Sequence, residues 1–303
     1  RDGENRIHAV RYTPDDGNVR GIVQIVHGMA EYVERYENLA EFLTKRGILV
    51  TGEDHLGHGK SVSEGGSFGY FCEQDPATVV VRDVHRLKKI TEEQYPQVPY
   101  IILGHSMGSF IARNYLCRYG SGIDGAVIVG TGMQPAGLIF VSKAMAGIQK
   151  LFCGSKHVSH FIDKAAFGGY NKRIDSPRTS SDWLSRNTEN VDRYIEDELC
   201  GFTFTVNGFQ TLFELIRRLQ KQENLEKVPQ NLPILMVSGA EDPVGDYGKG
   251  VHKACDSLKR AGVKNITVKL YENDRHELLN EDDAEVAMED IWQWICKEIP
   301  GVA

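Results

Sequence analysis

Apolar residues along the first half of the chain alternate between short continuous runs and longer segments with a helical repeat. Residues 31–47 repeat apolar side chains on one helical face, and Gly47 is a typical helix end. A second helix is expected from Asp75 and Pro76, and a third over residues 110–120. Segments that look like strands lie at residues 6–14, 21–28, 48–55, 100–106 and 123–131, and several of them are continuous apolar runs. Such runs are typical of strands covered on both faces, so the pattern predicts an α/β fold with a mostly parallel sheet and helices on both faces.

The same alternation returns near the end of the chain, with strands at 233–242 and 265–274 and helices at 248–262 and 285–299. Between residues 134 and 230 it breaks. This segment has no strand-like apolar runs, but residues 137–152 and 209–221 show the repeat of amphipathic helices. We therefore expect a core of residues 1–133 and 231–303. Residues 134–230, called the cap segment below, are expected to form a helical insertion over the carboxyl edge of the sheet.

Composition narrows the classes of protein that the pattern allows. The chain has 303 residues, 25% of them charged, and a net charge of −7 without any basic run, which argues against a nucleic-acid surface. No apolar stretch of about 18 residues stands out, so no membrane span is expected. The cap segment carries 13 Lys/Arg and 11 Asp/Glu, a net charge of +2, which favours transient membrane-surface contact more than the acidic core does.

The cysteines and the first residues bear on the cellular compartment. Six cysteines are scattered without a C-x-x-C pair, which is typical of free thiols in a reducing compartment, so a cytoplasmic protein is expected. They supply no zinc-ligand spacing, and neither a metal nor a cofactor is expected. The chain begins without Met or an apolar signal region, so we expect it to be trimmed or incompletely represented. The pattern does not predict an oligomeric state.

Ser106 is the first candidate for chemistry, in the pentapeptide Gly104-His105-Ser106-Met107-Gly108. G-x-S-x-G alone is common in a glycine-rich chain, but this one lies between a predicted strand and a predicted helix. A sharp strand-to-helix turn exposes the serine Oγ above a sheet, and glycines at 104 and 108 let the turn close. The position predicts a nucleophile.

A nucleophilic serine needs a histidine to take its proton and a carboxylate to orient that histidine. Asp242 and His276 each follow a predicted strand, in the chain order Ser, Asp, His that such sheets use. Glu241 and Asp246 flank Asp242 as weaker alternatives. Asp274 is expected to be a solvated loop carboxylate. These residues predict acyl transfer to water with no metal or cofactor.

The loops after two other strands supply supporting residues. The amides of Met29 and Met107 are predicted to form the oxyanion hole, and His27 and Gly28 to brace the loop before Met29. His105 is expected to be structural and to point to the other side of the turn. A further loop, at Asp54, His55 and His58, could be read as metal ligands, but we favour a hydrogen-bonded scaffold.

Together these motifs resemble the monoacylglycerol lipase and lysophospholipase branch of the α/β-hydrolase superfamily, in particular its bacterial members. The match extends over nearly the whole chain: "VHGMAEYVERYENLAEFL", "DHLGHGKS", "GHSMGS", "SGAEDPVG" and the His276 loop. The resemblance implies an α/β-hydrolase fold, the triad Ser106, Asp242 and His276, and a cap over an acyl-chain pocket. Ser109 departs from the family pattern, where a second glycine is usual, and we expect it to alter packing more than chemistry.

The predicted function is hydrolysis of a carboxylic ester, with monoacylglycerol or a related single-chain lipid ester as the substrate. A small-ester or cinnamoyl-type esterase, a thioesterase or an amidase would use the same triad. A non-catalytic lipid-binding module is the alternative from another class, and the intact triad argues against it. Most of the nine aromatic residues chosen in the cap segment are expected to pack it on the core, and the others to line an acyl tunnel: Phe140, Phe152, Phe161, Phe167, Trp183, Phe202, Phe204, Phe209 and Phe213.

Overall fold

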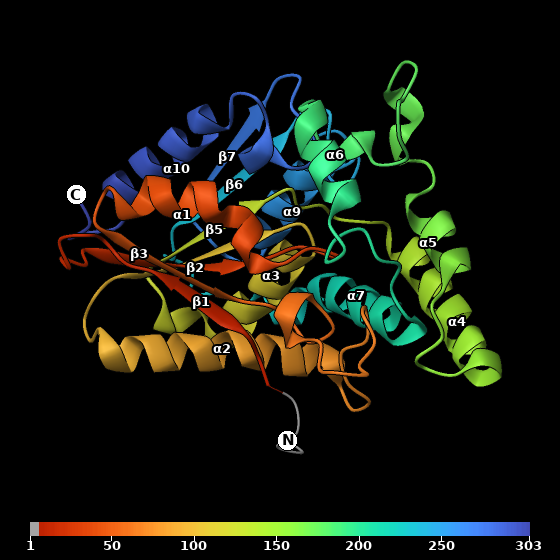
Figure 1. The fold of residues 1–303 in the computed structure, drawn as a ribbon. Coiled ribbons are helices and arrows are strands. Elements are labelled where there is room, and N and C mark those ends of the chain that lie inside the picture. Colours follow the sequence, from red (N-terminus) through yellow and green to blue (C-terminus); the bar gives the residue numbers. More distant parts are fainter. Residues whose placement is uncertain (1–5) are drawn as a thin grey trace.

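The computed structural model describes residues 6–303, which form a seven-stranded sheet with helices on both faces (Figure 1). The sheet order is β1-β3-β2-β4-β5-β6-β7, and only the β1–β3 pair is antiparallel. The predicted mostly parallel α/β sheet is therefore confirmed. The strands are β1 (Ala9–Tyr12), β2 (Gly21–Val26), β3 (Ile48–Glu53), β4 (Tyr100–His105), β5 (Gly125–Val129), β6 (Ile234–Gly239) and β7 (Ile266–Tyr271).

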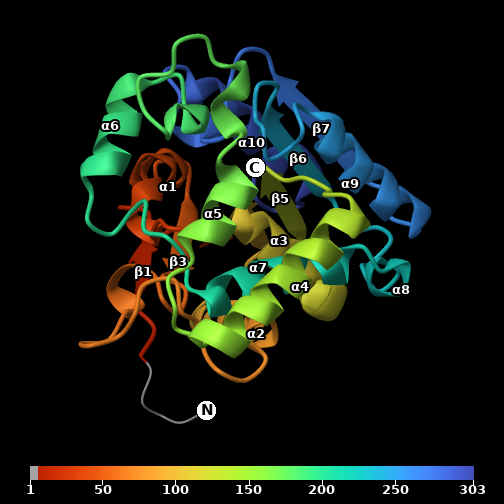
Figure 2. The same cartoon turned by 90° about the vertical axis from the view of Figure 1, so that its right-hand side faces the viewer.

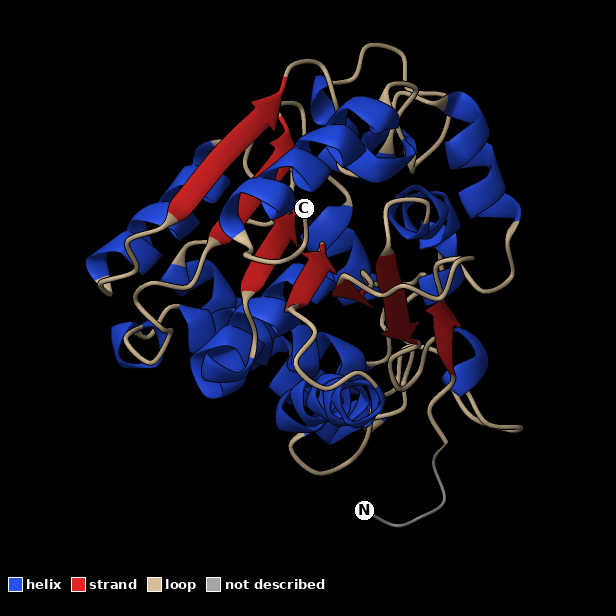
Figure 3. Cartoon of the chain, turned by 90° about the vertical axis from the view of Figure 1, so that its left-hand side faces the viewer, coloured by secondary structure: helices blue, strands red, loops and turns tan. Residues whose placement is uncertain are grey.

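Two groups of helices cover the sheet, as the secondary-structure view shows (Figure 3). The first apolar cluster lies between one face of the sheet and helices α1 and α10, and the second lies between the other face and α2, α3, α7 and α9. The helices are α1 (Glu37–Thr44), α2 (Pro76–Gln94), α3 (Met107–Tyr119), α4 (Ala136–Cys153), α5 (His160–Phe167), α6 (Thr188–Glu196), α7 (Val206–Leu219), α8 (Gln222–Leu225), α9 (Lys249–Arg260) and α10 (Ala284–Glu298).

The burial of each strand explains why its sequence pattern differs. Every residue of β2 to β6 is buried, which matches their continuous apolar runs, whereas the edge strands β1 and β7 alternate. Element ends were predicted less well. The strand expected over residues 6–14 is only β1, and the helix expected over 31–47 begins with a 3-10 turn at Val33–Tyr36 before α1. The carboxylate of Asp54 accepts the N–H of Val33, which holds that first turn against the end of β3.

The cap segment contains α4 to α8, and its helices differ in how deeply they pack. Helix α7 is mostly buried and packs against α2, α3 and α4. Helices α4 and α5 lie outside α7, on the side of the molecule toward which the strands β2 to β6 point (Figures 1 and 2). This arrangement places α4, α5 and the turns after α5 around the loops that follow the strands.

Helix α4 corrects the expectation that no apolar stretch of membrane-spanning length exists. Its 18 residues, Ala136–Cys153, are long and apolar enough to cross a membrane by length and composition alone, and only 11% of them are buried. The sequence search missed it because Lys143 and Lys150 interrupt the apolar positions. Several large apolar side chains of α4 are exposed, including Phe140 at 75% and Phe152 at 85%.

Candidate active site

Ser106 lies at a strained turn between β4 and α3. Its backbone has φ 53° and ψ −120°, a conformation that costs a residue with a side chain of order 1–3 kcal/mol. The N–H of Ser106 donates to the carbonyl of Val129 at the end of β5, 3.0 Å away, which helps to hold this conformation. A strained serine at a strand-to-helix turn is the feature that presents a nucleophile above a sheet.

The neighbouring glycines are required by close backbone contacts. A Cβ atom at Gly108 would overlap the carbonyl oxygen of Val26, and one at Gly104 would approach the backbone of Gly108. Helix α3 can therefore begin directly against the end of β2. Ser109 is buried, and its hydroxyl lies 2.6 Å from the carbonyl oxygen of Ser106. Ser109 thus adds a polar contact beneath the turn.

Asp242 and His276 meet at the ends of β6 and β7. The Nδ1 atom of His276 lies 3.0 Å from Oδ2 of Asp242, and both side chains are buried. The carboxylate of Asp242 also accepts the N–H of Val244 at 2.8 Å and the hydroxyl of Ser238 at 3.2 Å. These contacts fix the carboxylate, so that Nε2 is the nitrogen of His276 left to face the cavity.

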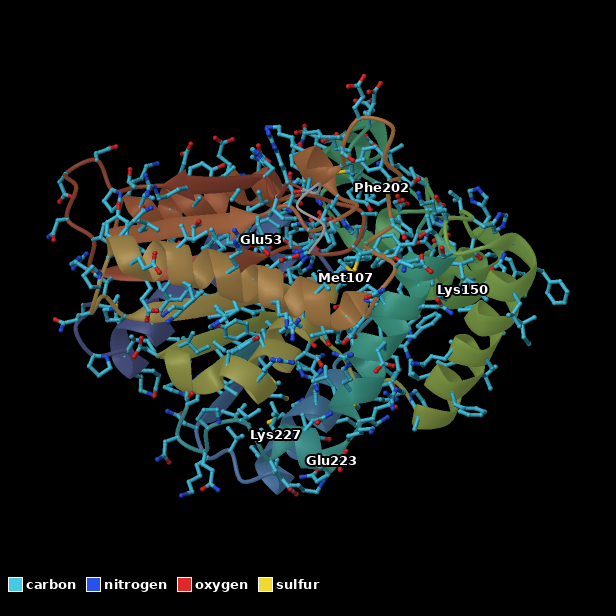
Figure 4. All side chains as sticks on the ribbon, turned by 90° about the horizontal axis from the view of Figure 1, so that it is seen from below. Glu53, Met107, Lys150, Phe202, Glu223 and Lys227 are labelled. Carbon is cyan, nitrogen blue, oxygen red and sulfur yellow. The ribbon has the colours of Figure 1, made fainter. Side chains whose placement is uncertain are left out.

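Ser106 and His276 both lie against the end of β5, and both line one cavity. Ser106 is hydrogen-bonded to Val129, and a Cβ atom on the next residue, Gly130, would lie 3.2 Å from the imidazole of His276. Both side chains line a cavity of about 510 Å³, as do Met29 and Met107. Figure 4 labels Met107 near the centre of the molecule, with Phe202 and Lys150 toward the side that carries α4 and α5.

The loop after β2 lies directly against the serine turn. A Cβ atom at Gly28 would be 3.1 Å from the Cβ of Ser106, so this loop and the start of α3 face each other at the cavity. The N–H of Gly28 donates to the carboxylate of Glu31, and His27 Nδ1 lies 2.8 Å from the carbonyl oxygen of Gly28. The loop that carries Met29 is thus held by its own side chains.

Most of the cavity lining is apolar and comes from the cap segment. Helices α4, α5 and α7 contribute aliphatic and aromatic side chains, whereas the loops that carry Ser106 and His276 contribute polar ones. The aromatic residues chosen from the sequence divide into two groups. Six of the nine belong to or pack against one apolar cluster, as expected for most of them: Phe167, Trp183, Phe202, Phe204, Phe209 and Phe213. Phe167, Trp183, Phe202 and Phe213 line the cavity, and Phe140, Phe152 and Phe161 are exposed.

Comparison with known proteins identifies the family of this chain. Residues 17–283 match the profile of a family described as serine aminopeptidase, S33. The chain belongs to this family of α/β-hydrolases. Monoglyceride lipase of Rattus norvegicus is 28% identical over 273 residues, 89% of this chain and 80% of that protein. Monoacylglycerol lipase of Mycolicibacterium smegmatis is 27% identical over 289 residues, 95% of this chain and 92% of that protein. A thermostable carboxyl esterase from Bacillus coagulans, solved with glycerol, has a TM-score of 0.91 and 31% identity, covering 98% and 96% of the two chains.

In this S33-family chain a network of buried charges lies beside the cavity. Arg35 forms ion pairs with Glu31 at 2.9 Å and with Glu277 at 2.7 Å, and all three side chains are at most 10% exposed. His105 lies 3.3 Å from Glu31 and contacts the carbonyl oxygen of His276 through Nε2 at 3.1 Å. Burial alone would raise the pKa of Glu31, but the hydrogen bond and charge of His105, together with Arg35, hold it well below its usual value.

The network corrects the expectation for His105. Burial opposes its protonation, but the bond to Glu31 and the charge of Glu31 raise the pKa of His105 above its usual value. Its ring lies 4.8 Å from that of His276, so it does not point away from the cavity side of the turn. Glu31, Arg35 and Tyr36 belong to the segment VHGMAEYVERYENLAEFL, for which the sequence predicted no network. Glu277 was not predicted to be functional, because nothing in the local sequence pattern distinguishes it.

Asp274 is a second correction, because it is not solvated. It is 3% exposed, and its carboxylate is bonded to the guanidinium of Arg186. The guanidinium of Arg186 also donates to the carboxylate of Asp283 at 2.9 Å. The backbone N–H of Arg186 donates to the carboxylate of Glu281 at 2.8 Å. Residues from the cap segment are therefore bonded directly to the loop that carries His276.

The loop at residues 54–58 forms a hydrogen-bonded cluster under the loop after β2. Asp54 accepts the N–H groups of Val33 at 2.9 Å and Lys60 at 2.8 Å. The N–H of His55 donates to Nε2 of His27 at 3.0 Å, and the rings of these two histidines lie 4.0 Å apart. His58 adds a third buried ring, 5.2 Å from that of His27.

One group of side chains in the described residues has ligand atoms close enough for a metal ion: His8, Glu34 and Asp54. The ammonium of Lys60 also bonds the carboxylate of Glu34 at 2.5 Å. The ammonium of Lys60 thus already provides a positive charge for Glu34. Both oxygens of Asp54 accept backbone N–H groups. These contacts favour a structural role for the group.

We predict that replacing Gly108 with alanine destabilises the protein, although alanine has the higher helix propensity. The added Cβ would overlap the carbonyl of Val26, so α3 must move, at a cost of about 1–3 kcal/mol in the free energy of unfolding. Urea denaturation measures this cost. Gly137→Ala in α4, where a Cβ meets nothing within 4 Å, is the matched control. Equal stability of the two variants would contradict the close contact.

We also predict that two buried histidines, His55 and His58, make the protein less stable in acid. Burial, and next the charge of His27, lower the pKa of His58 to about 3, and burial lowers the pKa of His55 well below its usual value. At these two positions, below about pH 6.5, the unfolded chain binds more protons than the folded one. Their contribution to stability therefore falls as pH drops from 6.5 toward 3, by up to about 1.4 kcal/mol per pH unit for each histidine.

The variant His58→Asn isolates this effect, since the amide can still donate to the carbonyl of Leu56, which His58 contacts at 3.1 Å. Its unfolding free energy, measured in urea between pH 7 and 5, should change less steeply with pH than that of the wild type. His252→Asn on the exposed side of α9 is the control and should leave the slope unchanged. A slope that stays the same in His58→Asn would show that His58 does not titrate in this way.

Proposed function

We propose that this chain hydrolyses the ester bond of monoacylglycerols or closely related single-chain lipid esters, with Ser106 as nucleophile. One observation carries the proposal. A strained serine at the β4–α3 turn shares an apolar cavity of about 510 Å³ with a histidine whose Nδ1 is bonded to a buried carboxylate. Cavities of this size bury most of a small lipid-like ligand. The chain is a carboxylic ester hydrolase of the α/β-hydrolase fold, and its relatives include proteins named monoglyceride lipases.

In the proposed reaction Nε2 of His276 takes the proton of the Ser106 hydroxyl as Oγ attacks the ester carbonyl. The tetrahedral intermediate collapses, and His276 gives that proton to the leaving alcohol. Water then attacks the acyl-enzyme by the same route and releases the fatty acid, so that one water is consumed and an alcohol and an acid are formed. Asp242 orients the imidazole and stabilises its charged form.

The amides of Met29 and Met107 are proposed to bind the oxyanion. Met107 begins α3, where the N–H groups are free of helix partners and the helix dipole favours negative charge. Met29 lies on the facing loop, whose Gly28 is against Ser106. Each such donor contributes about 3 kcal/mol in comparable enzymes.

The description of the family names aminopeptidases, and the cavity supports an ester substrate better. An aminopeptidase must bind the free ammonium of a peptide, which calls for an unpaired carboxylate. Glu31 and Glu277 line the cavity, but both are bonded to Arg35. A third lining carboxylate, that of Asp163, has a pKa raised by burial, which disfavours its charged form.

We further propose that residues 134–230 act as a cap and that its outer helices contact lipid surfaces. The inner side of α4 lines the cavity through Ile139 and Met145, while Phe140, Leu151 and Phe152 are exposed on its outside. Lys143 of α4 is bonded to Glu214 of α7, which holds α4 against the protein. These contacts favour a helix that lies on a lipid surface over one that spans a membrane.

We expect Ser106→Ala to lower kcat for long-chain monoacylglycerol by at least about 10⁴-fold, and Asp242→Asn by a similar factor because the wrong imidazole tautomer is then held. Hydrolysis of monoacylglycerol, methyl ferulate and p-nitrophenyl butyrate by purified protein measures this. An organophosphonate probe should label the wild type and not Ser106→Ala. Ser142→Ala, another serine that lines the cavity, is the matched control and should keep its labelling.

Two results would change these assignments. Labelling that persists in Ser106→Ala would contradict the nucleophile. A preference for the ferulate or the short ester, lost in Ser106→Ala, would keep the triad and replace the lipid substrate with a small ester.

The outer face of α4 gives a separate prediction. The triple substitution Phe140→Ser, Leu151→Ser and Phe152→Ser should weaken binding to phosphatidylcholine vesicles at least about tenfold, since each large side chain contributes on the order of 1.5 kcal/mol when buried in lipid. Hydrolysis of soluble p-nitrophenyl butyrate should not change. Ile90→Ser with Val286→Ser, which removes exposed apolar side chains from α2 and α10, is the control. Equal vesicle binding by all three proteins would refute the lipid-contact face.

A further inference from the structure

Trp183 packs directly on the predicted catalytic histidine. It lies in the 3-10 turn Asp182–Leu184 of the cap segment, and its ring centroid is 5.1 Å from that of His276. The ring of Tyr170 meets Trp183 edge to face at 4.9 Å. Both aromatic residues line the cavity that contains Ser106.

Behind these two rings lies a second pocket of about 350 Å³ with a very different lining. Tyr170 and Trp183 line this pocket too, so together they form an aromatic wall between the two spaces. The other lining residues are largely charged or polar, and they come partly from the loops that carry Asp242 and His276: Arg173, Ile174, Asp175, Glu241, Tyr247, Asn273 and Arg275. The second pocket is therefore polar, open to solvent and next to the catalytic loops.

Hydrogen bonds fix the wall to the loop of His276. The guanidinium of Arg275 donates to the carbonyls of Asp182 at 2.7 Å and Ser185 at 3.0 Å. The N–H of Glu277 donates to the carbonyl of Leu184 at 2.7 Å. Residues on both sides of His276 thus hold the turn that carries Trp183, so the indole keeps a fixed position relative to the imidazole.

The two ends of an ester must lie on different sides of this site. Nδ1 of His276 is bonded to Asp242, so the proton for the leaving alcohol comes from Nε2, and that alcohol must lie next to His276. Two rings pack on the imidazole, those of His105 and Trp183, and Trp183 is the one that the cap segment contributes. Apolar side chains of α4 and α7, such as Met145 and Phe213, line the same cavity and are available to the acyl chain.

We propose that Trp183 determines which alcohols the enzyme accepts, by closing the reaction cavity to headgroups larger than glycerol. A zwitterionic phosphodiester headgroup would need the space that the indole fills, and a path into the polar pocket behind it. That pocket has the charges to bind such a headgroup: guanidinium groups of Arg173 and Arg275 for a phosphate, and carboxylates of Asp175 and Glu241 for an ammonium. This inference rests on the proposed function and explains which leaving alcohols the enzyme would accept.

The test compares 1-oleoylglycerol with 1-oleoyl lysophosphatidylcholine in the same mixed micelles, so that only the alcohol differs. The wild type should prefer 1-oleoylglycerol at least about tenfold in kcat/KM. Trp183→Ala should raise the ratio of lysophosphatidylcholine to monoacylglycerol hydrolysis by at least about tenfold, and Tyr170→Ala should raise it in the same direction. Trp183→Phe, which keeps a ring, should remain close to the wild type.

Two further variants separate the effect from general damage. Phe213→Ala, on the acyl side, should change the preferred chain length and leave the headgroup ratio as it is. Adding Arg173→Gln to Trp183→Ala should remove most of the gain on lysophosphatidylcholine, since Arg173 is exposed and lines the polar pocket, where it stacks on Tyr247, but not the reaction cavity. Trp183→Leu replaces Trp183→Ala if the alanine variant does not fold.

The outcomes distinguish this inference from the proposed function. Absence of Ser106-dependent hydrolysis of either lipid by the wild type would refute the proposed function. Hydrolysis with an unchanged headgroup ratio in both Trp183→Ala and Tyr170→Ala would leave the proposed function in place and refute the role of Trp183. Equal use of the two lipids by the wild type would also overturn it.

Discussion

The close approach of helix α3 to the end of strand β2 is the constraint on which the site depends. Gly108 lies so near the carbonyls of Val26 and His27 that no larger residue fits without movement of the helix. This contact brings the first amide of α3 beside the loop that follows β2, and it forces Ser106 into its positive-φ conformation between β4 and α3. The strain at Ser106 persists because the buried sheet and helix on either side leave the turn no alternative.

The second constraint couples the cap segment to the loop that carries His276. Arg275, Glu277 and the carboxylates around Arg186 tie residues 182–187 to the loop after β7 through several hydrogen bonds and ion pairs. Most of these groups are buried, so removal of any one partner leaves a costly unpaired group. The cap is thus not attached uniformly. Its 182–187 turn is fixed to the histidine loop, whereas α4 and α5 expose much of their apolar surface.

The sequence predicted those features that depend on neighbouring residues, and it did not predict those that depend on contacts between distant segments. The sheet, its covering helices and the loop positions of Ser106, Asp242 and His276 come from local signals: continuous apolar runs, glycines at a turn and polar residues just after strands. Asp274, Arg275 and Trp183 depend on contacts between segments about ninety residues apart, such as that of Arg275 with Asp182. No spacing or periodicity encodes such a contact, which is why Asp274 was predicted to be solvated and Trp183 was one aromatic residue among nine.

Helix α4 carries apolar side chains for two purposes, to line the cavity and to form an exposed outer face. The hydrophobic repeat of its sequence could not separate the two. Its repeat predicts an amphipathic helix with one side toward the protein, yet apolar side chains occur on both sides: Ile139 is buried and Phe140 is exposed. The inner side needs apolar groups because it lines the cavity beside Ser106. Solvent alone would favour polar residues on the outer side, so the exposed phenylalanines require another explanation, namely a surface that water does not occupy in the working enzyme. The proposed function would supply such a surface, since a lipid ester resides in aggregates, and α4 would then lie between the aggregate and the cavity.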